Sequence, residues 1–256
     1  MNHARLDQLA EDGAKRYELF TEALQGVFGR HMNSVDFGKA DQINSVLRDC
    51  YDMADVWMRH EEIFLKAALE EIAGDAHQTT FARIVSADAS QDENAAQEHL
   101  ADTQSYLHHE LIAQIQRDIA LVRSTYQRLV LQVKIAARAQ RIPLRRAFLE
   151  NRIAKPETPL AFVFLDRKSR KWKSRVFVRT VWRHTLLSAY NEVVMSILAE
   201  HGHVNAVVAS QVDGSEIHNA TISLTGALNL MSYDEVRAEY FHPNSQAYLI
   251  PEGANV

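Results

Sequence analysis

Apolar residues recur every three or four positions through most of the first 140 residues, a spacing typical of amphipathic helices. The pattern predicts one helix over residues 4–31 and a second over about residues 40–72. The stretch AGDAHQTTFARIVSADASQ, residues 73–91, predicts a loop with at most one short ordered segment. Ser90, followed three residues later by Glu93, has the spacing of a capping box. It predicts the start of a very long helix that ends near residue 141, shortly before Pro143.

The middle of this long helix carries a regular apolar seam. From Ile119 onward the apolar positions advance by alternating steps of three and four, which is the heptad spacing of a coiled coil. The seam consists of Ile115, Ile119, Val122, Tyr126, Leu129, Val133 and Ala136. A seam of two to three heptads is open to two interpretations: antiparallel packing on the second helix of the same chain, which we favour, or an interface between copies.

The pattern changes to alternation after residue 155. LAFVFLD (160–166) and SRVFVRT (174–180) predict two strands of a β-hairpin joined by the basic turn RKSRKWK. A third stretch, from about residue 180 to Gly202, predicts an amphipathic helix that glycine ends.

Two further strand signals follow. NAVVASQV and SEIHNATISL predict a second hairpin around Asp213-Gly214, a dipeptide that favours a two-residue turn. HPNSQAYLIP (242–251) then predicts a turn at Pro243 and a closing strand that pairs with an earlier part of the chain.

These elements predict an α+β fold. Long N-terminal helices, arranged as a helical hairpin or a coiled coil, precede a small α+β domain with β-hairpins. The change of pattern places a helical domain at residues 1–155 and an α+β domain at residues 156–256.

Composition narrows the class of protein. No apolar run approaches the roughly 18–20 residues of a membrane span. The first twenty residues contain acids and no apolar core, so we expect no secretory signal. The single cysteine, Cys50, excludes an intrachain disulfide and a multi-cysteine metal site, and fits a reducing cytoplasm.

Charge is distributed unevenly along the chain. Residues 123–183 contain 17 Lys+Arg and 3 Asp+Glu, whereas the remainder contains 11 and 30, within a net charge of −5. Such separation bears on partners rather than on fold. A basic surface could dock on acidic surfaces of neighbouring copies, or it could bind nucleic acid.

The basic turn is the best functional candidate, because six cations fall within nine residues around one tryptophan. A loop of this kind can grip phosphates, with an affinity that falls steeply with salt. Trp172 could either stack on a ligand or belong to the core of the hairpin. The candidate binding residues are Arg167, Lys168, Arg170, Lys171, Lys173 and Arg175, extended by Arg145 and Arg146 beyond the end of the long helix.

An enzyme is the weaker interpretation. His201 and His203 could meet Glu216 and His218 to form a zinc site, and strand alternation would put the latter two on one face. A hydrolytic site could also be assembled from Asp213, His218 and His242. The sequence has no GxSxG, P-loop or GxGxxG motif. We therefore expect no catalytic residues, no metal ligands and no cofactor.

Three pieces of the C-terminal half occur together in an order that resembles a known family. They are FLDRKSRKWKSRVFVRTVWRHTLLSAYNEV, VVASQVDGSEIHNATISLTG and HPNSQAYLIP. This order is similar to the C-terminal domain of tailed-phage head morphogenesis proteins, the Mu F-like minor head family. The first piece also resembles the phage minor capsid proteins. The likeness covers roughly residues 160–251. The residues that carry its turns are Trp172, Asp213, Gly214, His242, Pro243 and Asn244.

One departure from the family pattern is clear. Family members often close on His-Pro-Asn-Cys-Arg-Cys, whereas this chain has Ser245 and Ala247 at the two cysteine positions. Whatever those cysteines do elsewhere, metal binding or pairing, cannot occur here. The shared element must be the turn and the strand.

The resemblance implies a minor virion protein in the phage head at the portal vertex, made in the host cytoplasm. It implies contact with the portal protein, the major capsid protein or other copies, and with double-stranded DNA in some members. A DNA-binding virion protein acting through the basic hairpin is the alternative, and a metal-dependent enzyme is a weaker one. We expect no membrane partner.

Overall fold

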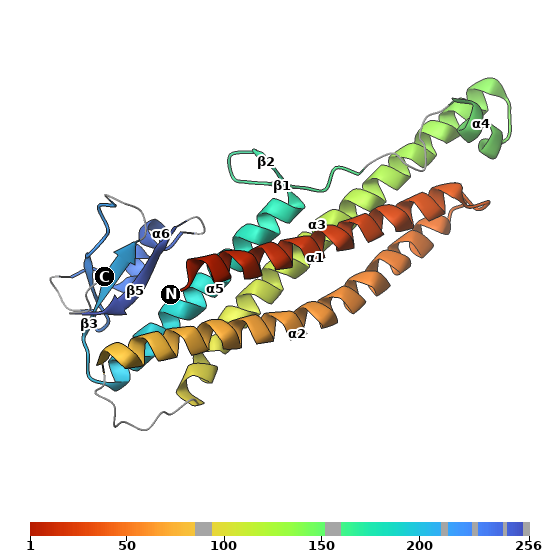
Figure 1. Ribbon diagram of the computed structural model, residues 1–256. Helices are drawn as coiled ribbons and strands as arrows, with labels where there is room; N and C mark the ends of the chain where they lie inside the picture. Colours follow the sequence, from red (N-terminus) through yellow and green to blue (C-terminus); the bar gives the residue numbers. More distant parts are fainter. Residues whose placement is uncertain (85–93, 152–159, 211–214, 227–229, 243–244, 253–256) are drawn as a thin grey trace. The chain divides into compact units, whose positions relative to one another are not determined.

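A computed structural model describes residues 1–84, 94–151, 160–210, 215–226, 230–242 and 245–252 (Figure 1). The helices are α1 (His3–Asn33), α2 (Gln42–Ile84), α3 (Asn94–Gln140), α4 (Leu144–Asn151), α5 (Ser174–Glu200) and α6 (Tyr233–Tyr240). The strands are β1 (Val163–Leu165), β2 (Lys171–Lys173), β3 (Asn205–Ser210), β4 (Thr221–Ser223) and β5 (Ala247–Pro251). The predicted α+β fold is confirmed: long N-terminal helices precede a small domain with antiparallel strands.

Helix α2 is longer than predicted. It continues to Ile84, so the prediction of a loop from residue 73 is wrong as far as that residue, and residues 85–91 lie outside the described part. The extension has a clear cause, because Ala73, Ala76 and Thr80 are buried and continue the stripe that includes Leu69.

The segment SRVFVRT was predicted as a strand, and this prediction is wrong. Residues 174–180 form the first turns of α5, while the strand that pairs with β1 is β2, inside the predicted basic turn. Ser174, Val178, Val181 and Thr185 are all buried at helical spacing. That periodicity, not the alternation of Val176 with Val178, decides the local structure.

The chain divides into two compact units. Unit 1 comprises residues 1–13, 62–110 and 178–256, and unit 2 comprises residues 14–61 and 111–177. Each unit therefore combines segments from both sides of residue 155, the predicted domain boundary.

The seam of α3 lies in unit 2. Its residues are buried within the single chain, except that Ala136 is half-buried and Ala137 takes the inward position. Tyr126 packs edge-on against Phe37, at a ring distance of 5.7 Å. The seam is thus buried within the single chain, and Phe37, in the connection after α1, is one of its partners.

Unit 1 contains a three-stranded sheet in the order β4-β3-β5. Both neighbours run antiparallel to β3, with Val207 opposite Thr221 and Ile250. All five residues of β5 are buried. The predicted closing strand is therefore confirmed, and the part of the chain with which it pairs is β3.

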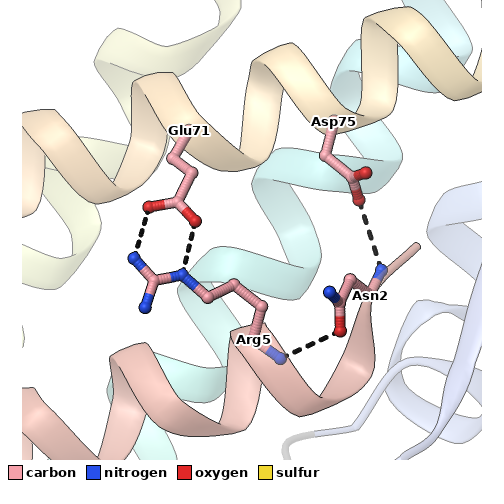
Figure 2. A network of polar contacts seen from close by, with 4 residues as sticks. All are labelled: Asn2, Arg5, Glu71 and Asp75. Atoms are coloured by element: carbon pink, nitrogen blue, oxygen red, sulfur yellow. Dashed lines mark hydrogen bonds and ion pairs between the residues drawn. The ribbon is translucent and has the colours of Figure 1, made fainter.

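The start of α1 is held to α2 by a polar network, which Figure 2 shows. Arg5 donates from Nε and Nη2 to the two carboxylate oxygens of Glu71, at 2.5 and 2.8 Å. The backbone N–H of Asn2 donates to Asp75, and the Asn2 side chain accepts from the N–H of Arg5.

Candidate functional site

The basic turn forms a compact hairpin in unit 2. Phe164 lies opposite Trp172 in the antiparallel pair of β1 and β2. Ser169 closes the turn with a φ of 58°, and its N–H donates to the carbonyl of Asp166 at 2.8 Å.

Asp166 organises this turn through four hydrogen bonds. Its Oδ1 accepts the backbone N–H groups of Lys168 and Arg170, both at 2.9 Å. Its Oδ2 accepts from the guanidinium of Arg170 at 2.6 Å and from the indole N–H of Trp172 at 3.2 Å. Loss of solvent around the carboxyl acts to raise its pKa, but these bonds outweigh it and lower the pKa of Asp166 to about 2. The carboxylate is therefore charged at any physiological pH.

Aromatic side chains form the base of the hairpin. Phe164 stacks on Phe177 of α5 at a ring distance of 4.1 Å. Arg117 of α3 lies over both rings, 5.0 and 5.3 Å from their centres. Trp172 is half-buried and bonded to Asp166, so its indole N–H is already used inside the hairpin.

The remaining cations point outward. Among the described residues, no polar partner contacts the side chains of Arg167, Lys168, Lys171 and Lys173, and all four are exposed. Two predicted members differ, because Arg170 is bound to Asp166 and Arg175 forms an ion pair with Glu18 at 3.2 Å. The hairpin thus displays four free charges on a turn fixed by a fifth cation and an acid.

The two arginines of α4 have structural contacts. Arg145 points toward the carbonyls of Met32 and Asn33 at 3.5 Å and lies over Phe148, while Arg146 pairs with Glu150 at 2.6 Å. These contacts occupy the guanidinium groups that the sequence suggested for ligand binding.

The predicted turn residues Asp213, Gly214, Pro243 and Asn244 lie outside the described residues. His242 is exposed, and its carbonyl accepts the N–H of Ser245 at 2.8 Å. The prediction that Glu216 and His218 share a strand face is wrong, since residues 216–219 form a turn and β4 begins at Thr221. The ring of His218 instead accepts the backbone N–H of Ser210 at 3.1 Å.

Within the described ranges, no group of three or more His, Cys, Asp or Glu side chains is arranged to hold a metal ion. The ring of His201 bonds to the carbonyl of Ile197 at 2.8 Å. Burial raises the pKa of the Cys50 thiol to about 12. No described helix is both long and apolar enough to cross a membrane.

Unit 2 also contains a buried polar cluster between its helices, which was not predicted from the sequence. Asp118 is almost fully buried and accepts hydrogen bonds from Tyr17 (2.7 Å), Gln114 (3.1 Å) and Ser174 (3.0 Å). Burial raises the pKa of Asp118, and the three bonds oppose that shift. The only sequence signal is the spacing of Gln114 and Asp118, four residues apart beside an apolar seam.

A second set of contacts holds the closing segment of unit 1. Arg183 of α5, itself buried, donates to Asp7 at 2.7 Å and to the carbonyl of Ser245 at 2.6 Å. The side-chain oxygen of Asn191 accepts the N–H of Leu249 at 3.0 Å. These α5 residues belong to the first of the three sequence pieces, and two of their partners, Ser245 and Leu249, belong to the third.

No protein-family model, no curated protein and no solved structure matches this chain.

Proposed function

We propose that this chain is a structural minor head protein of a tailed bacteriophage, bound at or near the portal vertex and acting in head assembly and in genome packaging or ejection. Its partners would be the portal protein, the major capsid protein or further copies of itself. Its work would be binding rather than catalysis.

One observation supports the proposal: the second and third sequence pieces that resemble the Mu F-like family, and the part of the first piece from residue 178 onward, all lie in unit 1. The second piece supplies β3, and the third supplies β5, which pairs with it. The first piece supplies Arg183 and Asn191, whose side chains hold the turn and strand of the third. The part of the likeness from residue 178 to residue 251 thus corresponds to one packed unit, which supports a shared fold over chance similarity of short motifs.

The departure at the two cysteine positions is consistent with this proposal. The Ser245 hydroxyl donates to the carbonyl of Tyr240 at 2.5 Å and accepts the N–H of Ala247 at 3.0 Å. Ala247 is buried. Hydrogen bonding and packing therefore hold Ser245 and Ala247 in place without a thiol.

The test is quantitative mass spectrometry of purified virions of the encoding phage, with peptides of the portal and major capsid proteins as internal references. We expect this chain in the particle at a copy number near that of the portal protein, both before and after DNA release. Absence from virions, with presence only in infected-cell lysate, would overturn the proposal.

DNA contact through the hairpin is the second candidate function. The four free cations, Arg167, Lys168, Lys171 and Lys173, favour it, because a fixed turn loses little conformational entropy when it binds phosphates. Replacing all four by glutamine should reduce the slope of log K against log salt concentration for duplex binding. The expected reduction corresponds to the loss of about three to four phosphate contacts. The matched control replaces four exposed cations of α3, Arg123, Arg128, Lys134 and Arg138, by glutamine. An equal loss of duplex affinity in both variants would show nonspecific attraction to the basic residues 123–183 rather than a site on the hairpin.

A further inference from the structure

Unit 1 contains a polar cavity that the proposed structural role does not use. The cavity lies between the first part of α3, α5 and α6, and its volume is about 390 Å³. This volume is within the size range of small-molecule sites in proteins. Each of its described lining residues carries a hydroxyl, a carboxylate or a guanidinium group. Such a wall suits a polar ligand rather than an apolar one, because buried polar groups need partners.

Helical spacing gathers the lining residues on two facing surfaces. On α5, Thr185, Ser188 and Glu192 follow one another at steps of three and four, so they share one face of the helix. Thr103 and Tyr106 share a face of α3 in the same way. The hydroxyl of Thr103 donates to Oε2 of Glu192 at 2.5 Å, so these two faces are turned toward each other.

The floor of the cavity is buried and its rim is exposed. Thr103, Thr185 and Ser188 are at most 5% exposed, whereas Asp102 and Tyr106 are exposed. A ligand can therefore enter past the rim and reach the buried hydroxyl groups. The hydroxyls of Thr103 and Thr185 already donate within the protein. Among the described residues, none accepts the hydroxyl proton of Ser188, so this buried donor is available to a ligand.

Arg237 brings a positive charge to the cavity from α6. Its guanidinium donates to the Ser188 hydroxyl oxygen at 3.4 Å and lies 5.9 Å from the centre of the Tyr233 ring, which helps to fix its position. In the described part of the chain, no carboxylate pairs with this guanidinium. Because arginine presents several N–H donors in a planar fork, it can bind the carboxylate of a ligand in a bidentate manner.

Two carboxylates, those of Asp102 and Glu192, line the same cavity. Glu192 lies one helical turn beyond Ser188 on α5, and Asp102 adjoins Thr103 at the exposed rim. A simple anion would be repelled by both acids, and a simple cation would be repelled by the guanidinium of Arg237. A ligand that carries both charges avoids both costs. Residues four apart on a helix lie about 5–6 Å from each other, so the positive and negative partners suit a compact zwitterion.

We propose that unit 1 binds a small zwitterion of the α-amino acid class in this cavity. The ligand carboxylate would accept hydrogen bonds from Arg237 and from the hydroxyl of Ser188. The ligand ammonium group would donate to Glu192, with Asp102 adding negative charge at the rim. Because the wall comes from three helices, the bound ligand would hold α6 against α3 and α5 and would stabilise unit 1.

Isothermal titration calorimetry of the purified chain tests this proposal with the standard α-amino acids, one at a time, at concentrations up to about 10 mM. We expect at least one of them to bind. Its α-carboxamide lacks the carboxylate and its N-acetyl derivative lacks the ammonium group. Each derivative should bind at least about tenfold more weakly than the parent amino acid, since each loses charge-assisted hydrogen bonds. The derivatives also control for general effects of added solutes.

Two variants assign each charge of the ligand to its partner in the protein. R237Q should bind the amino acid at least about tenfold more weakly and should lose most of the preference over the carboxamide. E192Q keeps an acceptor for Thr103 and should lose most of the preference over the N-acetyl derivative. The matched control R83Q changes an exposed arginine of unit 1 outside the cavity and should bind like wild type. Far-UV circular dichroism checks that the helices of each variant are intact.

Three results would overturn the proposal: no α-amino acid binds, the two derivatives bind as tightly as their parent, or R237Q binds as tightly as wild type. The first two results need only the wild-type chain, so they do not depend on whether a variant folds. Because the purified chain suffices, all three outcomes are separate from that of the virion experiment.

Discussion

Gly13 and Trp182 are in direct contact: a methyl group on Gly13 would lie 2.7 Å from the indole ring of Trp182. Trp182 is fully buried, so its ring has no room to withdraw. The absent side chain of one helix thus makes space for the largest side chain of another.

Gly13→Ala should therefore destabilise unit 1, although alanine is the better helix former. We expect a loss of about 1–3 kcal/mol from overpacking. Gly74→Ala is the control, because nothing lies within 4 Å of the added methyl and α2 should gain about 0.5–1 kcal/mol. Urea denaturation measures both changes. Stabilisation by both would contradict the packing of Trp182 on Gly13.

The ion pair of Arg16 and Glu61 should matter more than that of Arg5 and Glu71. Arg16 donates to both carboxylate oxygens of Glu61, at 2.7 and 3.1 Å, and the Glu61 side chain is 2% exposed. Arg16→Ala leaves that carboxylate buried without its main partner and should lower the free energy of unfolding by about 3 kcal/mol.

The pair in Figure 2 is the matched control, since it has similar geometry but exposed side chains. Arg5→Ala should change the unfolding midpoint much less. Thermal denaturation measures the two midpoints. Comparable shifts for the two variants would show that burial of the carboxylate does not determine how much each ion pair contributes to stability.

The buried side chain of His3 should make the folded protein less stable in mild acid. Burial, followed by the charge of Arg183, lowers the pKa of His3 to about 4 from an ordinary value near 6.5. Between these values the unfolded chain binds a proton that the folded chain does not, so stability falls as the pH falls.

From this group alone, the free energy of unfolding should be about 2 kcal/mol lower at pH 5 than at pH 7. His3→Phe should remove that part of the pH dependence while keeping the edge-on contact with Tyr248. Denaturant titrations of the wild type and the variant at pH 5 and pH 7 measure this difference in the free energy of unfolding. An unchanged difference in the variant would assign the effect to other groups.

Asp166 should control the order of the basic hairpin. Asp166→Ala removes all four of its hydrogen bonds and should accelerate amide exchange at Lys168 and Arg170. Asp166→Asn keeps an oxygen acceptor for those N–H groups and should show a smaller effect. Because its folded pKa is about 2, the contribution of Asp166 is complete above pH 3.8 and is lost only as the pH falls through 2. Exchange that is equally slow in both variants would contradict this role.

Asn191 should be required for the closing strand. Asn191→Ala leaves the N–H of Leu249 without its acceptor in a buried site, which costs about 1–3 kcal/mol. Asn191→Asp keeps an acceptor at the same place and separates the lost bond from lost packing. Limited proteolysis should release the C-terminal segment earlier from the alanine variant than from wild type.

The sequence predicted well the elements whose burial pattern is local. The limits of α1 and the strand β5 follow from apolar spacing that each segment carries by itself, and the end of α3 follows from Pro143 shortly after it. The sequence-based prediction failed where contacts between residues far apart in the sequence determine the local secondary structure. Residues 174–180 alternate like a strand, but Ser174 bonds to Asp118 and Phe177 stacks on Phe164, and these contacts favour the helix.

The candidate site was predicted in composition but not in arrangement. The cluster of cations is visible in the sequence, whereas the role of Asp166 depends on turn geometry that charge counting cannot supply. Arg145, Arg146 and Arg175 looked equivalent to the others, yet each is engaged by a residue distant in sequence or one turn away. Only three-dimensional contacts separate free cations from structural ones.

The composition of unit 1 has a consequence for how the protein is made. Residues 1–13 contact α2 through Asn2 and Arg5, but their contacts with residues 178–256 cannot form until more than 160 intervening residues have been synthesised. The start of α1, with Trp182, Arg183 and β5 not yet synthesised, has no native neighbours for Gly13, Asp7 or His3. Unit 2, complete at residue 177, can form first. During translation unit 1 is therefore completed last. Residues 1–177 contain 25 Lys+Arg and 25 Asp+Glu, so the whole net charge of −5 is added by residues 178–256, which contain 3 Lys+Arg and 8 Asp+Glu.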